Sequence, residues 1–153
     1  MTTYLNRFQH FTSLSRVQQR TLVASWAWLP LFSLGLRVMG LPGFRALLQR
    51  KTVRGATVMT LPGMQALGEA VNIAARHMPY PATCLTRSLL MNWLLHRRGV
   101  PSDLRIGVRI TNGTLDAHAW VEVGGVPVND RPDVVGQFMP FGDLVPLGAF
   151  DVR

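Results

Sequence analysis

The apolar residues of this 153-residue chain change their spacing at Gly99, and that change limits the fold more than any other feature of the sequence. Before Gly99 they recur every three or four residues, as in "GMQALGEAVNIAARHM", where Met64, Leu67 and Val71 share one helical face. After it, "DLRIGVRI" alternates apolar with polar or small residues, which predicts a strand with one buried face. Helices followed by strands predict an α+β domain with a mostly antiparallel sheet.

The first helical region, residues 13–50, is expected to form two or three pieces, interrupted at Pro30 and stopped near Gly40. Its stretch Thr21–Leu36 carries no charged residue. Sixteen residues with a proline inside fall short of the roughly 20 that a membrane-spanning helix needs. We therefore expect a core-packing helix or a docking face. Contact with a membrane surface is the less favoured alternative, and we do not expect it.

The chain is expected to divide into two units. Residues 1–50 would be an N-terminal helical region that packs on the rest or docks a partner, and residues 51–153 would be the main domain. Within the main domain, two prolines separate the first helix from a second one, which begins near Cys84 and stops at Gly99. The Pro- and Gly-rich tail is assigned to no element.

Positive charge is concentrated in the first half of the chain. Residues 1–83 carry nine Arg or Lys and one acidic residue, Glu69, whereas residues 84–153 carry seven of each sign. We predict that this basic half docks a partner protein or the acidic part of a peptide. The alternative is a general preference for arginine, since 15 of the 16 basic residues are Arg. Nucleic acid is not expected, because the basic half shows neither exposed aromatic residues interleaved with the basic ones nor a recognisable nucleic-acid-binding module.

Cysteine usage and the N-terminus bear on location and cofactors. One cysteine excludes an internal disulfide, and no secretory signal is evident, so we expect a cytoplasmic protein. A single Cys with scattered His lacks the paired spacing of a zinc site, and no glycine-rich phosphate loop is present. No metal or other cofactor is therefore expected.

Cys84, in "PYPATCLTRSLL", is a candidate nucleophile. A thiol at a helix N-terminus is favoured as a thiolate by unpaired backbone N–H groups and the helix dipole. It needs a base, and the base needs a group that orients it. His96 lies about three turns along the same helix and is out of reach, whereas His118 lies on a strand that precedes Asp130. A small buried structural cysteine is the alternative interpretation.

The turn at Gly124-Gly125 decides whether His118 and Asp130 meet across a hairpin. A two-residue turn would pair His118 with Arg131 and point Asp130 to the other face. A three-residue loop with a bulge at Gly125 would place His118 directly across from Asp130, with Cβ atoms about 5 Å apart. The sequence thus permits a Cys84–His118–Asp130 triad. Trp120, on the same face as His118, would shield the imidazole, bind substrate or simply pack.

Three stretches, "CLTRSLLMNWLLHRRGVPSDLRIGV", "AHAWVEVGG" and "VND", together resemble one family. They are similar to the transglutaminase-like cysteine peptidases of lasso-peptide biosynthesis, the leader-processing B proteins. The likeness is strong over residues 79–130 and weaker over the leucine- and arginine-rich helices upstream. Cysteine after a proline-containing bend, "RG" closing the helix, and "AHAW" follow at the family's spacing, which favours the triad over a structural cysteine.

The resemblance implies a transglutaminase-like or papain-like core, in which the helix that carries Cys84 packs on a small antiparallel sheet. It implies that Cys84 attacks the peptide bond between leader and core, that His118 moves the proton, and that Asp130 orients His118. The backbone N–H of Cys84 is expected to help hold the oxyanion. Papain-like enzymes add a glutamine shortly before the cysteine, and "HMPYPAT" contains none.

The same resemblance implies partners. They are the precursor peptide, a separate leader-binding recognition protein and, less directly, the ATP-dependent synthetase that closes the macrolactam ring. The chain resembles the split form of the family, because nothing in it resembles an added recognition domain.

Two other functions stay open on the sequence alone. The same three residues suit another acyl transfer, either transamidation or deamidation, because fold and triad do not decide between them. The basic N-terminal half also suits a non-catalytic docking module, whose binding would survive Cys84→Ala.

Overall fold

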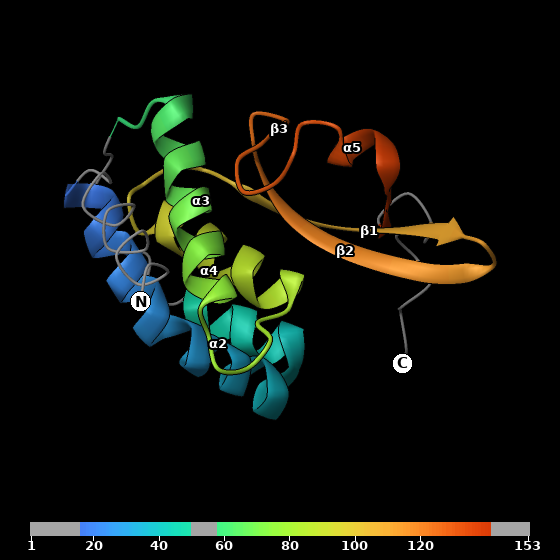
Figure 1. Ribbon diagram of the computed structural model, residues 1–153, viewed down its shortest axis with the longest axis horizontal. Coiled ribbons are helices and arrows are strands. Elements are labelled where there is room, and N and C mark those ends of the chain that lie inside the picture. The colour runs from blue at the N-terminus through green and yellow to red at the C-terminus, as the bar shows by residue number, and fades with distance from the viewer. Residues whose placement is uncertain (1–15, 50–57, 142–153) are drawn as a thin grey trace, which may run out of the picture.

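The computed structural model describes residues 16–49 and 58–141, so the tail beyond residue 141 and the predicted unit boundary at residue 50 lie outside the described residues. The elements follow in the order α2 (Arg16–Gln49), α3 (Leu61–Arg76), α4 (Cys84–His96), β1 (Asp103–Thr111), β2 (Thr114–Val123), β3 (Val126–Pro127), α5 (Val134–Gln137) and β4 (Met139–Pro140). The strands pair antiparallel in the order β3-β2-β1-β4, which confirms the α+β prediction. Figure 1 shows the helices gathered beside the sheet and the β1–β2 hairpin reaching past them.

Helix α2 does not break at Pro30, so that prediction is wrong. Pro30 is on the exposed side of the helix, where water can satisfy the carbonyl that the missing N–H leaves free. The helix turns back at Gly40 instead, whose φ of 67° lies in the left-handed region. The returning arm packs Phe44 edge-on against Phe32 at 5.1 Å between ring centroids.

The stretch Gln19–Leu48 of α2 is long and apolar enough to cross a membrane by length and composition, and 17% of its most apolar window is buried. The core helix of a soluble protein has the same composition, so this property is weak evidence of a membrane location. The contact between Phe32 and Phe44 shows that the stretch is folded back on itself and is not one straight rod.

The core is built where α2, α3 and α4 meet one face of β2. The predicted apolar face of α3 is buried as expected, with Val71 and Ala74 at most 1% exposed. Leu90 and Leu95 of α4 are fully buried, and Val121 brings β2 into the same cluster. This packing fixes the start of α4 relative to the middle of β2, which positions the candidate site.

The β1–β2 hairpin extends beyond the helices that cover it. The sequence predicts one buried face along β1, but this is wrong for the second half of the strand, where Ile110 is 76% exposed. The C-terminal half of α4 meets the hairpin beside the start of β1, where Asn92 donates to the carbonyl of Ser102 at 3.0 Å. Near the tip of the hairpin, Leu115, which pairs with Ile110, is also exposed, at 66%.

Candidate active site

Cys84 is the first residue of α4, as the sequence predicts, and its thiol is free and partly exposed. Thr83 is the N-cap: its side-chain oxygen accepts a hydrogen bond from the backbone N–H of Thr86 at 3.2 Å. Because the cap is a side chain, the helix begins sharply at the cysteine. The thiol thus lies at the partially positive N-terminal end of a 13-residue helix.

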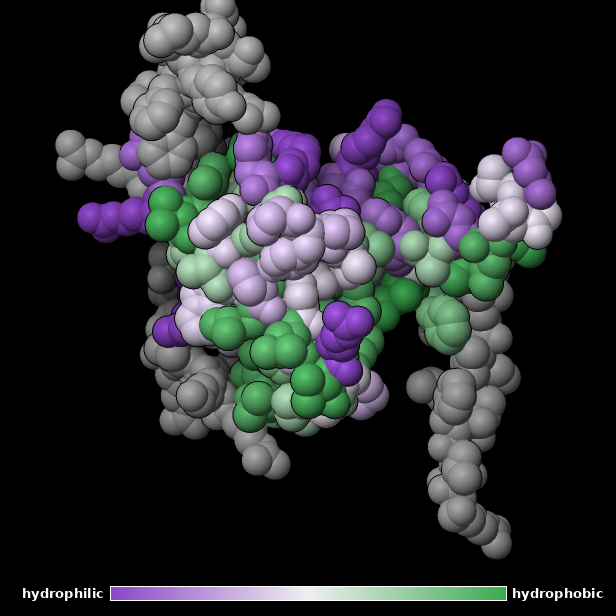
Figure 2. Space-filling view, turned by 60° about the horizontal axis from the view of Figure 1, so that its bottom comes forward, coloured by the Kyte–Doolittle hydropathy of each residue, from purple (hydrophilic) through white to green (hydrophobic). Residues whose placement is uncertain are grey.

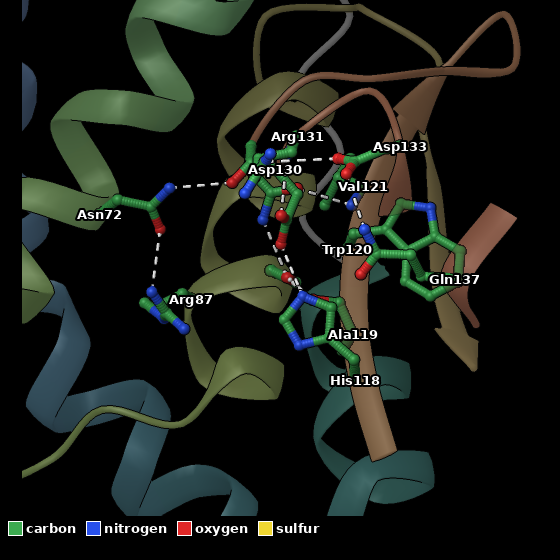
Figure 3. A network of polar contacts seen from close by, with 12 residues as sticks. Asn72, Arg87, His118, Ala119, Trp120, Val121, Asp130, Arg131, Asp133 and Gln137 are labelled. Carbon is green, nitrogen blue, oxygen red and sulfur yellow. Dashed lines mark hydrogen bonds and ion pairs between the residues drawn. The ribbon is translucent and has the colours of Figure 1, made fainter. Parts of the chain in front are cut away.

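The structure brings His118 and Asp130 together. Nε2 of the imidazole lies 2.6 Å from Oδ2 of the carboxylate, and the two side chains are 23% and 26% exposed (Figure 3). An ionised carboxylate only accepts, so Nε2 carries the proton and donates it. In the neutral imidazole, Nδ1 is then the nitrogen that can act as a base.

This contact forms although the hairpin takes the register that was predicted to prevent it. Val123 pairs with Val126 across a two-residue turn, and Gly124 and Gly125 both have positive φ. The predicted separation of His118 and Asp130 does not occur, because the β2–β3 ladder ends before it reaches Asp130. After Pro127 the chain leaves the strand, so strand alternation no longer decides which way the carboxylate points.

Asn129 ends the ladder by replacing a backbone carbonyl with its own side chain. Its Oδ1 accepts from the backbone N–H of Val121 at 2.7 Å, and its Nδ2 donates to the hydroxyl of Ser88 at 2.9 Å. That hydroxyl donates in turn to the carbonyl of Ala119 at 2.8 Å. Asn72 of α3 donates to the carbonyl of Asn129 at 2.8 Å (Figure 3).

This network joins the three segments that carry the predicted catalytic residues. Three of its members are neighbours of these residues: Asn129 precedes Asp130, Ala119 follows His118, and Ser88 lies one turn after Cys84. Ser88 and Asn129 are buried, at 1% and 8% exposure, so these bonds form away from water. The sequence analysis missed both residues, although "VND" placed Asn129 directly before the predicted orienting carboxylate.

The Cys84 thiol, in contrast, forms no hydrogen bond with His118 in the described residues. The bond between Ser88 and the carbonyl of Ala119 places the first turns of α4 beside the residue that follows His118. Hydrogen bonds between a nucleophile and its base are often longer in free enzymes than in substrate complexes. The geometry therefore supplies an oriented base beside a helix that begins with a thiol.

Trp120 is fully buried, so in this conformation its ring faces His118 and not a surface where a peptide binds. The two rings are nearly parallel, at 18° and 6.3 Å between centroids. Phe138, from the tail that the sequence left unassigned, lies 5.1 Å from the imidazole. These rings form an aromatic wall beside His118.

The other described histidines have local roles. His77 bonds to the carbonyl of Ile73 at the end of α3, and His96 bonds to the carbonyl of Ser102, so neither is near the candidate base. His10 lies outside the described residues. Within residues 16–49 and 58–141, no group of three or more His, Cys, Asp or Glu is arranged to hold a metal ion.

A pocket of about 450 Å³ lies beside the segment that leads into Cys84. Its lining includes Met78, Tyr80 and Ala82 before the cysteine, and Arg87 one turn after it. The hydroxyl of Tyr80 and Nε of Arg87 are buried without a hydrogen-bond partner among the described residues. Arg87 is held by Asn72, whose Oδ1 accepts from Nη1 at 3.3 Å (Figure 3).

Two comparisons with known proteins found similarity. The family model described as the transglutaminase-like superfamily matches residues 26–142. The chain is also similar to the microcin J25-processing protein McjB of Escherichia coli, with 38% identity over 55 residues. That match covers 36% of this chain and 26% of McjB, so it spans about a quarter of the relative's length. No solved structure matches the chain.

Proposed function

Because the chain belongs to the transglutaminase-like superfamily, we propose that it is a cysteine peptidase that cleaves the leader from a ribosomally made lasso-peptide precursor. The observation that carries the proposal is the 2.6 Å contact between His118 and Asp130, which leaves Nδ1 as a base beside the helix that begins at Cys84. The similarity to McjB, which is named for processing microcin J25, supports the choice of substrate class.

In the proposed mechanism, Nδ1 of His118 takes the thiol proton and the Cys84 thiolate attacks the scissile carbonyl. His118 then gives the proton to the leaving amine as the C–N bond breaks, and an acyl-enzyme remains. Water, deprotonated by His118, hydrolyses the thioester and frees the thiol. Asp130 holds the imidazole in its tautomer and stabilises the imidazolium that forms twice in each turnover.

The backbone N–H of Cys84 is the proposed donor to the oxyanion. It is at the first position of α4, where a helix has no internal acceptor for it. The side-chain oxygen of Thr83 accepts from the N–H of Thr86, and the backbone carbonyl of Thr83 accepts from the N–H of Arg87. Neither oxygen therefore accepts from the N–H of Cys84. This donor therefore stays available for the tetrahedral intermediate.

A separate leader-binding protein is the proposed partner, with the ring-closing synthetase acting on the same precursor. The outer face of α2, defined here as Arg20, Val23, Trp26, Leu31, Leu34, Arg37 and Val38, is exposed. Val23, Leu34 and Val38 are 58–74% exposed, which is unusually high for large apolar residues that recur along one helix face. Figure 2 shows hydrophobic side chains gathered over the turned end of α2 and, separately, along the β1–β2 hairpin.

Mass spectrometry of a precursor peptide, incubated with the protein and its leader-binding partner, tests the proposal. Wild type is expected to cut one bond, and Cys84→Ala and His118→Ala are expected to cut none. His96→Gln serves as the matched control, because His96 lies on the same helix as Cys84 but, within the described residues, bonds only to the carbonyl of Ser102.

The outcomes separate the proposed peptidase from its two rivals. A free carboxylate at the cut supports hydrolysis, whereas a new amide would show a transferase. An intact precursor with wild type, together with binding that survives Cys84→Ala, would contradict the peptidase and favour a docking module.

A further inference from the structure

A buried carboxylate lies on the same face of β2 as His118, four residues along the strand. The side chain of Glu122 is 7% exposed and accepts two hydrogen bonds. One comes from the indole Nε1–H of Trp120 at 2.8 Å, and the other from Nε of Arg105 at 3.1 Å. Burial of a carboxylate is costly unless its oxygens are paired, so both partners are needed to keep it there.

The indole that Glu122 holds is part of the aromatic wall beside His118. Phe138 completes this wall, with centroids 5.1 Å from His118 and 6.3 Å from Trp120. Gly107, the residue opposite His118 in the ladder, leaves room for it. A Cβ at Gly107 would lie 2.9 Å from both Phe138 Cβ and Trp120 Cη2, so a larger residue would displace the wall.

Asp130 and the wall restrain different motions of the imidazole. The hydrogen bond to Asp130 fixes the position of one atom, Nε2, but the ring can still rotate about that bond. The nearly parallel indole, at 6.3 Å between centroids, and the tilted ring of Phe138, at 5.1 Å, limit rotation of the imidazole plane, and with it the direction in which Nδ1 points. Rotation of the indole is itself opposed, because it would leave a buried N–H and a buried carboxylate oxygen unpaired.

We infer that Glu122 is a positioning residue, which holds Trp120 so that the aromatic wall aims Nδ1 of His118 at the thiol. The inference rests on the proposed function, because it takes His118 to be the general base. Glu122 has no contact with the reacting atoms and acts through the indole.

Three variants separate this role from plain stabilisation. Glu122→Ala removes the acceptor, and kcat is expected to fall about 10- to 100-fold, as for a misplaced catalytic group, with KM within about twofold of wild type. Glu122→Gln keeps an oxygen for the indole and is expected to retain kcat within about threefold. Trp120→Phe keeps a ring but loses the N–H, and should resemble Glu122→Ala.

Glu69→Gln is the matched control. Glu69 also pairs with an arginine, Arg76, at 2.6 Å, but both residues belong to α3, and the Glu69 side chain is 57% exposed. It is expected to keep kcat and KM. Circular dichroism confirms that each variant is folded at the assay temperature.

NMR of the His118 ring protons tests the inference without turnover. The ring current of Trp120 shifts these resonances, so Glu122→Ala should move them while Glu122→Gln and Glu69→Gln leave them in place. Unmoved resonances and wild-type kcat in Glu122→Ala would overturn the inference. Equal losses in Glu122→Ala and Glu122→Gln would also overturn it. If wild type cleaves nothing, the proposed function fails, and the NMR result alone decides whether Glu122 positions the imidazole.

Discussion

At the scale of single residues, the candidate site depends on a polar side chain that does no chemistry in the proposed reaction. Asn129 is buried, and both ends of its carboxamide are bonded, to Val121 and to Ser88. An amide suits this place because it offers an acceptor and a donor from one planar group without charge. A serine would lack the reach, and an aspartate would lose the donor.

Asn129→Ala is expected to lower the free energy of unfolding by about 2–4 kcal/mol, because it leaves the buried N–H of Val121 unpaired and removes the donor to the buried hydroxyl of Ser88. It should lower kcat/KM further, because Asp130 is the next residue. Ser88→Ala removes one of the same bonds, so the double variant should lose less than the sum of the two. Urea denaturation measures the coupling. Strict additivity would contradict a shared network.

At the scale of elements, the loop after β3 is shaped by the helix beneath it. Gly68, inside α3, has no side chain, and a Cβ there would lie 2.3 Å from the carbonyl oxygen of Val128 and 2.8 Å from Cα of Asn129. Both are backbone atoms, which cannot rotate away. Helix α3 thus touches the loop that presents Asp130, and the close approach requires glycine in a helix that would otherwise favour alanine.

Gly68→Ala is expected to destabilise the protein by about 1–3 kcal/mol in spite of the better helix propensity, because the loop must shift. Its kcat/KM should fall by more than its stability explains. Gly136→Ala is the matched control, since none of the described residues lies within 4 Å of a Cβ built there. Thermal unfolding and the precursor-cleavage assay measure the two effects. A stabilised and fully active Gly68→Ala would contradict the proposed contact.

At the scale of the whole molecule, charge and exposed apolar surface both favour the N-terminal half as the docking side. The outer face of α2 carries Arg20 and Arg37, and no acidic residue precedes Glu69 in the sequence. Charge of one sign on a partner-binding face increases the rate of association with an acidic partner and makes affinity depend on salt. Arg-rich composition alone predicts neither effect.

Affinity for the leader bound to its recognition protein is expected to weaken about tenfold or more between about 50 and 500 mM NaCl, because salt screens exposed charges. Arg20→Gln with Arg37→Gln should weaken it similarly at low salt. Arg97→Gln, on an exposed arginine of the neutral half, is the control. Titration calorimetry measures each affinity. If binding does not depend on salt and the double variant binds like wild type, the proposed docking role of the basic half is wrong. Its charge then reflects only a general preference for arginine.

Features that depend on neighbours along the chain could be predicted from the sequence. The apolar spacing of α3 gave its buried face, Gly99 with φ of 74° ends the helix that Cys84 begins, and the order of helices and strands gave the fold class. The predictions that failed are those in which the position of a residue relative to the protein surface decides the structure. Pro30 is tolerated because it faces outward, and Ile110 is exposed because α4 ends short of it.

Only the tertiary structure decided how the candidate site is assembled. The sequence supplied Cys84 at a helix start and the residue types of a base and its orienter, because capping and strand patterns are local. Counting residues across the hairpin could not place Asp130 against His118, since Asn129 ends the ladder by bonding to Ser88, 41 residues earlier. Bonds between residues so far apart leave no periodic trace in the chain. The packing of α3 and α4 on the sheet decides which residues form these bonds. The tertiary structure likewise decides the placement of Glu122 and of the aromatic wall.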